Sequence, residues 1–181
     1  MSVRKLVQCF AVVVSLAVSA ASAYAQNAQV RQGFWFSGGL GVGSMGCQDC
    51  GGDRLNGLSG GLSLGGTISP RFLIGVGTTG WVKQDQGATL TVGTLDARLR
   101  FYPSTTGGFF LTGGLGVGSI SGTLAGAGTQ TETGFGAVLG LGYDIRIAKN
   151  ASITPYWNSF AMSNDYIDAN VGQIGLAITL H

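Results

Sequence analysis

The stretch GGLGVGS occurs twice in this chain, at residues 38–44 and again at residues 113–119. In both copies a large apolar residue alternates with glycine or serine, and an aromatic pair comes shortly before. This is the period of two that is typical of a β-strand. The copies begin 75 positions apart, which leaves room for four strands of about ten residues with their connections. Two such halves predict eight strands.

Residues 1–25 have the features of a secretory signal peptide. Two basic residues precede an apolar run at 6–18, and the small residues at 23–25 fit a cleavage site. The alternative, an uncleaved membrane anchor, needs about 20 apolar residues, and this run is shorter. The sequence therefore predicts a signal peptide at 1–25 and a single β-barrel domain at 26–181.

The composition narrows the class of protein. Charged residues make up 10% of the chain, against about 25% in an ordinary soluble domain. After residue 25 the basic and acidic residues are equal in number, so no basic surface for nucleic acid is expected. All 33 glycines lie after residue 25. Together with the regular alternation, they indicate a special β architecture and not a low-complexity chain.

The alternation predicts eight strands that follow one another in chain order. They lie at about 32–43, 57–69, 71–82, 88–102, 109–119, 131–147, 151–162 and 170–181. In the fourth strand, Leu90 and Val92 have the wrong parity for the apolar face, which requires a bulge or burial in the barrel mouth. The seventh strand is expected to be the weakest because Pro155 and Ser159 interrupt it.

The direction in which the apolar face points decides between two kinds of barrel. In a soluble barrel the large apolar side chains fill the interior, and the other face must be charged enough for water. Here the other face is mostly Gly, Ser and Thr, which suits a narrow lumen. We therefore predict an all-β fold, an eight-stranded antiparallel transmembrane β-barrel with up-and-down meander topology. The residues expected to face lipid include Phe36, Leu40, Leu62, Leu64, Ile74, Val76, Leu111, Leu115, Leu139, Leu141, Trp157, Leu176 and Ile178.

The lengths of the connections predict which end of the barrel faces outward. Connections after the odd-numbered strands, at 44–56, 83–87, 120–130 and 163–169, are mostly longer and polar, and the others are mostly tight. In transmembrane barrels the longer loops are extracellular and the short turns periplasmic.

With these features the chain after residue 25 resembles the OmpA/OmpX-type family of eight-stranded outer-membrane β-barrels. The resemblance rests on the signal peptide, the regular strand spacing and a terminal strand at 171–181. The family usually ends in an aromatic residue, commonly Phe, and this chain has His181 there. The resemblance implies insertion into the cell outer membrane after signal cleavage. It also implies a monomer in contact with outer-membrane lipid, lipopolysaccharide among the candidates, and with the outer-membrane assembly machinery.

Catalysis is not expected from this resemblance. Enzymes among small outer-membrane barrels use a histidine near the outer rim, paired with Ser or Asp, as a general base. The sole histidine here, His181, is placed at the periplasmic end. The sequence therefore predicts no catalytic residue.

Cys47 and Cys50 form the only Cys-x-x-Cys motif and are expected in the first external loop. In an exported protein this spacing favours a local disulfide. A free or redox-active pair and a metal site are the alternatives, although a zinc site needs further Cys or His ligands. A GxGxxG match at 41–46 lacks the helix that a dinucleotide site needs, so no cofactor is expected.

Five charged residues share the inward parity near the periplasmic end, namely Asp96, Arg98, Arg100, Asp144 and Arg146. Eight strands enclose an interior just wide enough for side chains, so this luminal charge cluster predicts a structural salt-bridge plug. A narrow ion pathway is the alternative. Six acidic residues map to the external rim. They are either ordinary residues of solvated loops or ligands for divalent cations, and the sequence leaves both alternatives open. The six are Asp49, Asp53, Asp85, Glu132, Asp165 and Asp168.

These observations predict an integral outer-membrane β-barrel protein with a structural or surface-interaction role and no catalysis. A narrow small-solute or ion pore is one alternative, and a soluble periplasmic ligand-binding barrel is another. No cofactor, bound metal or nucleic acid is expected.

Overall fold

The computed structural model describes residues 31–47, 54–85, 87–124, 128–164 and 168–181. The signal peptide predicted at 1–25 and one of the two candidate cysteines, Cys50, lie outside these residues. Among the described residues no helix is long and apolar enough to cross a membrane.

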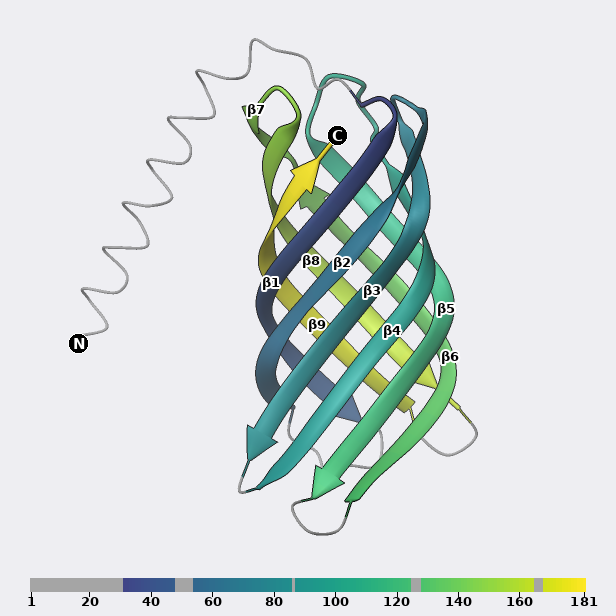
Figure 1. The fold of residues 1–181 in the computed structure, drawn as a ribbon, viewed down its shortest axis with the longest axis vertical. Helices are drawn as coiled ribbons and strands as arrows, with labels where there is room; N and C mark the ends of the chain where they lie inside the picture. Colours follow the sequence, from purple (N-terminus) through teal and green to yellow (C-terminus); the bar gives the residue numbers. More distant parts are fainter. Residues whose placement is uncertain (1–30, 48–53, 86, 125–127, 165–167) are drawn as a thin grey trace, which may run out of the picture.

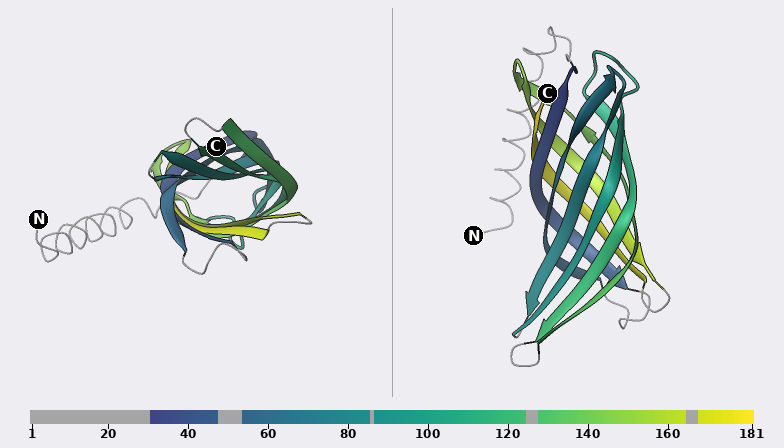
Figure 2. Two further views of the ribbon diagram at one scale, coloured as in Figure 1. Left: turned by 90° about the horizontal axis from the view of Figure 1, so that it is seen from below. Right: turned by 45° about the vertical axis from the view of Figure 1, so that its right-hand side comes forward.

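The described residues form one closed antiparallel barrel. Its strands are β1 (Phe34–Cys47), β2 (Leu55–Ser69), β3 (Phe72–Asp85), β4 (Ala88–Phe101), β5 (Phe109–Leu124), β6 (Gly128–Tyr143), β7 (Ile145–Ala148), β8 (Ala151–Ser163) and β9 (Asp168–Leu180). Strands that follow one another in the chain pair, except β6 and β7, which both pair with β8, and β1 pairs with β9 to close the ring (Figures 1 and 2). Because β6 and β7 occupy one position in the ring, both beside β8, the barrel has eight positions. The predicted fold class is confirmed.

The strand expected at 131–147 is divided in the structure. β6 ends at Tyr143, Asp144 is not part of a strand, and the short β7 continues the pairing with β8. Pro155 of β8 lies beside this break, between the β6 pairing that ends at Tyr156 and the β7 pairing that begins at Ile153. A proline has no N–H to donate to a ladder, and at this break little pairing is lost. The predicted interruption at Pro155 and Ser159 was therefore wrong, since β8 runs unbroken from Ala151 to Ser163.

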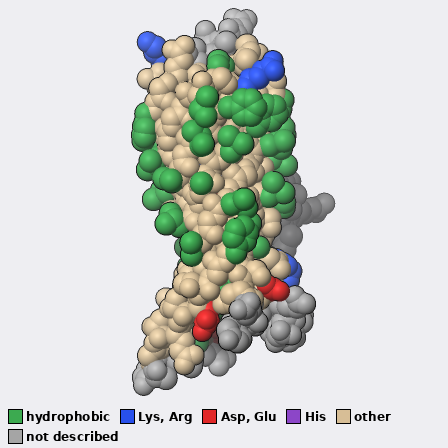
Figure 3. All heavy atoms as spheres, turned by 90° about the vertical axis from the view of Figure 1, so that its right-hand side faces the viewer, with side chains coloured by type: hydrophobic (Ala, Val, Ile, Leu, Met, Phe, Trp, Pro, Cys, Tyr) green, Lys and Arg blue, Asp and Glu red, His purple; other side chains and the backbone are tan. Residues whose placement is uncertain are grey.

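The apolar face of the strands points outward. Leu40 is 69% exposed, Leu115 62% and Leu139 67%, although all three lie in the middle of the sheet. Of the residues predicted to face lipid, all are exposed except Phe36, which is half-buried. On the face drawn in Figure 3, hydrophobic side chains form a broad band over the body of the barrel, and few are visible toward the end below the band. Such a band suits lipid and not water, so the soluble-barrel alternative was wrong.

The connections differ from the lengths expected. At one end, here called the loop end, the chain crosses between strands at 48–54, 86–87, 125–127 and 164–167. At the other end, here called the terminal end, the connections are 70–71, 102–108 and 149–150. The 102–108 connection is not tight, and several loop-end connections are short because the strands themselves continue. The β3–β4 and β5–β6 hairpins extend farthest (Figures 1 and 2).

Candidate functional site

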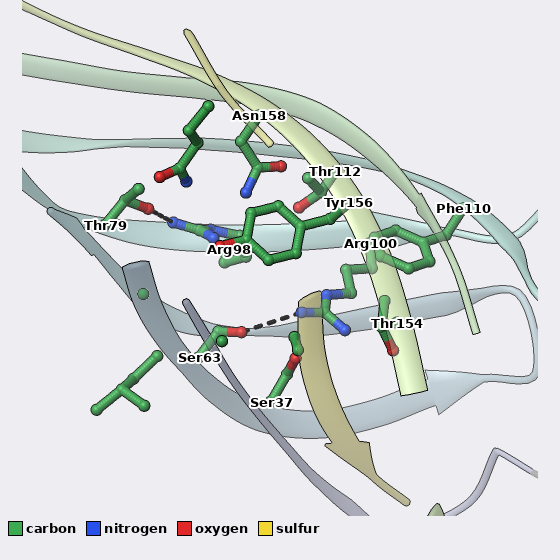
Figure 4. Close-up of a pocket in the computed structure, with 15 residues that line it drawn as sticks. Ser37, Ser63, Thr79, Arg98, Arg100, Phe110, Thr112, Thr154, Tyr156 and Asn158 are labelled. Carbon is green, nitrogen blue, oxygen red and sulfur yellow. Dashed lines mark hydrogen bonds between the residues drawn. The ribbon is translucent and has the colours of Figure 1, made fainter. Parts of the chain in front are cut away.

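Charged side chains fill the middle of the barrel interior. Arg98 donates from Nε to Asp96 Oδ1 at 2.6 Å and from Nη2 to Oδ2 at 2.5 Å, and it also donates to the Thr79 hydroxyl at 3.0 Å. Arg100 donates to the Ser63 hydroxyl at 3.1 Å. All of these side chains are buried, and Figure 4 shows the two guanidinium groups among polar side chains from several strands.

Glycines on the inward face make room for these large groups. Alternation in strands that curve around a narrow lumen would otherwise bring opposing side chains into collision. A Cβ on Gly77 would lie 2.6 Å from the guanidinium carbon of Arg98. This explains why Gly and Ser alternate with the large apolar residues in the sequence. On the inward face, these small residues leave the space that the few charged side chains occupy.

A second polar cluster closes the terminal end around Asp144. Tyr102 donates its hydroxyl hydrogen to Asp144 Oδ2 at 2.8 Å, and Thr154 donates to Oδ1 at 2.7 Å. His181 Nε2 lies 3.5 Å from Oδ2. Asp144 is 1% exposed and Tyr102 is fully buried.

The ionisation of this cluster follows from its contacts. Burial alone would raise the pKa of Asp144, but His181, the Arg100 charge and the hydroxyls of Thr154 and Tyr102 together hold that pKa below its usual value. Burial and the adjacent Asp144 carboxylate raise the pKa of Tyr102. The geometry thus keeps a carboxylate beside a phenol that stays protonated and donates.

Arg31 covers this cluster from the terminal end, a role that sequence reasoning missed. Its guanidinium carbon lies 3.6 Å from the centre of the Tyr102 ring. It donates to the carbonyls of Pro70, Ser104, Thr105 and Gly107 in the turns at this end. An arginine shortly before an apolar strand gives no signal of such a role, because the turns that bind it are 39 to 76 positions away in the chain.

The interior near the loop end is apolar. Its buried side chains are Met45, Trp81, Val92, Val138, Phe160 and Val171, here called the apolar plug. Trp81 Nε1 donates to the Gly43 carbonyl at 3.0 Å, which satisfies the one polar group of its ring. The apolar plug explains the unusual parity of Leu90 and Val92. Val92 is fully buried in it and Leu90 packs against it, and the β3–β4 register has no shift. Of the two explanations predicted for Leu90 and Val92, burial in the barrel mouth is confirmed and a bulge is not found in this register.

Little open space remains between these layers. One interior cavity of about 40 Å³ lies beside Arg98 and Arg100, which is room for two or three waters. Arg100 Nε and Nη1 and Gln173 Oε1 are buried with no hydrogen-bond partner among the described residues, and such waters would satisfy them. The described side chains therefore close the lumen at both ends.

The remaining candidates lie toward the two ends of the barrel. Arg146 lies on β7, where its guanidinium donates to the carbonyls of Ala148 and Lys149 in an exposed hairpin. Arg146 keeps the predicted inward parity, because it pairs with the buried Ser152 in the same register on β8 as β6, and these bonds place its guanidinium at the terminal end of the barrel. Cys47 ends β1, whereas its predicted partner Cys50 lies outside the described residues, so the disulfide stays a prediction.

The described acidic residues of the external rim lie at the loop end, away from the charged residues in the middle of the lumen. Asp85, Glu132 and Asp168 lie at the loop end, whereas Asp49, Asp53 and Asp165 are outside the described part of the chain. No group of three or more His, Cys, Asp or Glu side chains that could hold a metal ion occurs among the described residues.

An antiparallel ring of eight positions, with an apolar outer band and a polar filled interior, defines a transmembrane β-barrel. The family described as "Outer membrane protein beta-barrel domain" matches residues 11–179, and the chain belongs to this family. The outer membrane is therefore the location that the family implies.

Solved structures give the same fold. Neisserial surface protein A is 14% identical, with a TM-score of 0.62, covering 84% of this chain and 99% of that protein. Ail, the attachment invasion locus protein of Yersinia pestis, is 11% identical, with a TM-score of 0.60, covering 83% of this chain and all of Ail. Ail in complex with the heparin analogue sucrose octasulfate gives a TM-score of 0.60 at 12% identity. No curated protein matches the chain.

Proposed function

We propose that this protein is a closed outer-membrane barrel with a structural or surface-interaction role, without conduction or catalysis. The observation that carries the proposal is the filled interior. The Asp96–Arg98 ion pair, the buried cluster of Trp35, Leu73, Tyr102 and Phe110, and the apolar plug leave a cavity of only about 40 Å³. An ion pathway needs a continuous water-filled route. A closed barrel has its accessible surfaces at its ends.

The loop end is the surface proposed to meet partners outside the cell. There the β5–β6 hairpin continues past the apolar band with hydroxyl side chains on its outer face, and Ser121 and Thr123 bond to Thr131 and Thr129 at 2.9 Å. This polar sheet suits water and the head groups of lipopolysaccharide. Ail, which shares the fold, is by its name a protein of attachment and invasion, and this is consistent with a surface role here.

The rest of the proposal follows the family. The chain is exported with cleavage of a signal peptide, inserted by the outer-membrane assembly machinery, and works as a monomer surrounded by outer-membrane lipid. The contacts of His181 support the proposed absence of catalysis. Neither of its ring nitrogens bonds to a hydroxyl among the described residues, and the Thr154 hydroxyl bonds to Asp144 instead of the imidazole.

Planar-bilayer recording of the refolded protein tests the closed barrel. We expect no conductance steps above those of the lipid alone, for the wild-type protein and for Arg98→Ala. Steps that change with Arg98→Ala or Arg100→Ala would instead support the narrow-pore alternative. A heat-modifiable gel band from the same preparation checks that the barrel is folded.

Labelling in intact cells tests the outward direction of the loop end. In a Cys47→Ser, Cys50→Ser background, a membrane-impermeant maleimide should label Thr131→Cys and leave Lys149→Cys unlabelled until the cells are lysed. The reverse pattern would contradict the proposed orientation.

A further inference from the structure

The loop end contains a second, much larger cavity. It measures about 550 Å³ and is lined by residues of β2 to β6, including Leu55, Lys83, Leu90, Ile120, Gly122 and Glu132. These six residues, here called the vestibule, belong to the inward parity of their strands. Its volume is within the range of small-molecule sites in proteins, and the function proposed above does not explain it.

The floor and the wall of the vestibule differ in chemistry. Leu55, Leu90 and Ile120 are partly buried and rest on the apolar plug, so they form an apolar floor. Lys83, Gly122, Gln130 and Glu132 line the wall. Lys83, Leu90, Gly122 and Gln130 pair in one row across β3 to β6, and Glu132 lies in the next row down, paired with Ile120. An apolar floor with charged groups at its sides suits an amphipathic ligand.

The two charges lie on opposite sides of this floor. Lys83 is on β3 and Glu132 on β6, three strand spacings apart, which is about 14 Å along the curved wall. Within the described part of the chain neither side chain has an ion-pair partner, because the ion pairs found there join Arg98 to Asp96 and His181 to Asp144. Asp85, one row above Lys83, adds a further negative charge at the rim.

The wall between the charges is open at Gly122. A side chain placed there would meet no atom within 4 Å, and the backbone is not in the left-handed region. Space therefore continues from the apolar floor up the middle of the wall, between Lys83 and Glu132.

We infer that the vestibule binds a short apolar peptide with free termini. Its carboxylate would pair with Lys83, its ammonium group with Glu132, and its side chains would cover Leu55, Leu90 and Ile120. The wall from Lys83 to Glu132 is about 14 Å long. Because both charged side chains reach inward and shorten the distance between them, the space between them has room for a peptide of two or three residues at about 3.3 Å each. The inference rests on the proposed function, in which the loop end is the recognition surface.

Calorimetric titration of the folded protein in detergent with the tripeptide Leu-Ala-Phe tests this. Wild-type protein should bind it, and Gly122→Leu, which fills the cavity, should abolish binding. Gly172→Leu is the matched control, because a side chain at Gly172 also meets no atom within 4 Å but lies on the outer face of β9, and it should bind as the wild type does. Equal binding by Gly122→Leu and wild type, or no binding by wild type, would overturn the inference.

Blocked peptides separate the two ends of the ligand. Amidation of the carboxyl terminus should weaken binding to wild type about fivefold and have no effect on Lys83→Met. Acetylation of the amino terminus should likewise weaken binding to the wild type about fivefold and have no effect on binding to Glu132→Gln. This size of effect is expected because exposed ion pairs contribute up to about 1 kcal/mol. If blocking either end changes nothing in the wild type, the assigned contacts are wrong. A barrel that fails to bind yet stays closed in bilayer recordings would refute this inference alone and leave the proposed function intact.

Discussion

Asp96 and Arg98 lie two positions apart on β4, so the period of two points both side chains into the lumen, where they form a bidentate pair. A charge in such a narrow interior has few alternative partners. Removing one member of a buried pair leaves the other uncompensated, which costs more than removing both.

Asp96→Asn should therefore lower the free energy of unfolding by about 3 kcal/mol. The double variant Asp96→Asn, Arg98→Met should lose less than the sum of the two single variants. Urea unfolding followed by the heat-modifiable gel band measures this. Strict additivity would show that water, and not the pair, solvates the two charges.

Asp144 predicts a dependence of stability on pH. Because its pKa in the folded barrel is below the usual value of 3.8, its contribution is fully present above that value. The contribution is lost as the pH falls through the lower pKa of the folded state. The unfolding midpoint of the wild-type protein should drop more steeply below pH 3.8 than that of Asp144→Asn. Parallel curves for the two proteins would show that the Tyr102 and Thr154 contacts do not favour the carboxylate.

At the scale of the strands, alternation predicted which residues face outward, the inward placement of Asp96, Arg98 and Arg100, and the burial of Val92. It could not predict the break at Asp144, where the backbone N–H donates to the Gly108 carbonyl of the connection after β4 instead of to the β8 ladder. It also misjudged the ends of β3 to β6: nothing in a polar, glycine-rich stretch distinguishes a loop from a strand that continues into water.

The inward glycines give a prediction at this scale. A Cβ on Gly118 of β5 would lie 2.5 Å from Met162 Cβ of β8 inside the lumen, whereas one on Gly66, on the outer face, would meet nothing within 4 Å. Gly118→Val should lower the free energy of unfolding by about 1–3 kcal/mol through overpacking. Gly66→Val should change it little. Similar losses at both positions would show that backbone effects, and not lumen packing, explain the glycines.

The β5–β6 hairpin above the apolar plug should be dispensable for folding. Ser121 pairs with Thr131, so an Asn-Gly turn can replace residues 122–130 and close a two-residue hairpin. The shortened protein should still give a heat-modifiable band, with the free energy of unfolding within about 1 kcal/mol of the wild type, because surface segments outside the core contribute little. Loss of the folded band would place part of the stabilising core in this hairpin.

For the whole molecule, composition and periodicity were enough to predict a barrel, its topology and its lipid-facing surface, because these follow from a pattern repeated in every strand. The closed ends could not be predicted in the same way. Arg31 reaches turns far away in the chain, and the vestibule arises only where the longer strands extend beyond their neighbours. Function depends on these ends, so it was less predictable than the fold.

The apolar face of the strands points to lipid and the polar face to a filled lumen, and the three tryptophans report on both faces. Trp157 is 41% exposed on the outer face, whereas Trp35 and Trp81 are fully or almost fully buried in the interior. Quenching of tryptophan fluorescence by brominated lipids should therefore affect only Trp157, and Trp157→Phe should remove the quenching. Strong quenching that persists in Trp157→Phe, from Trp35 or Trp81, would mean that the interior and exterior faces have been assigned the wrong way round.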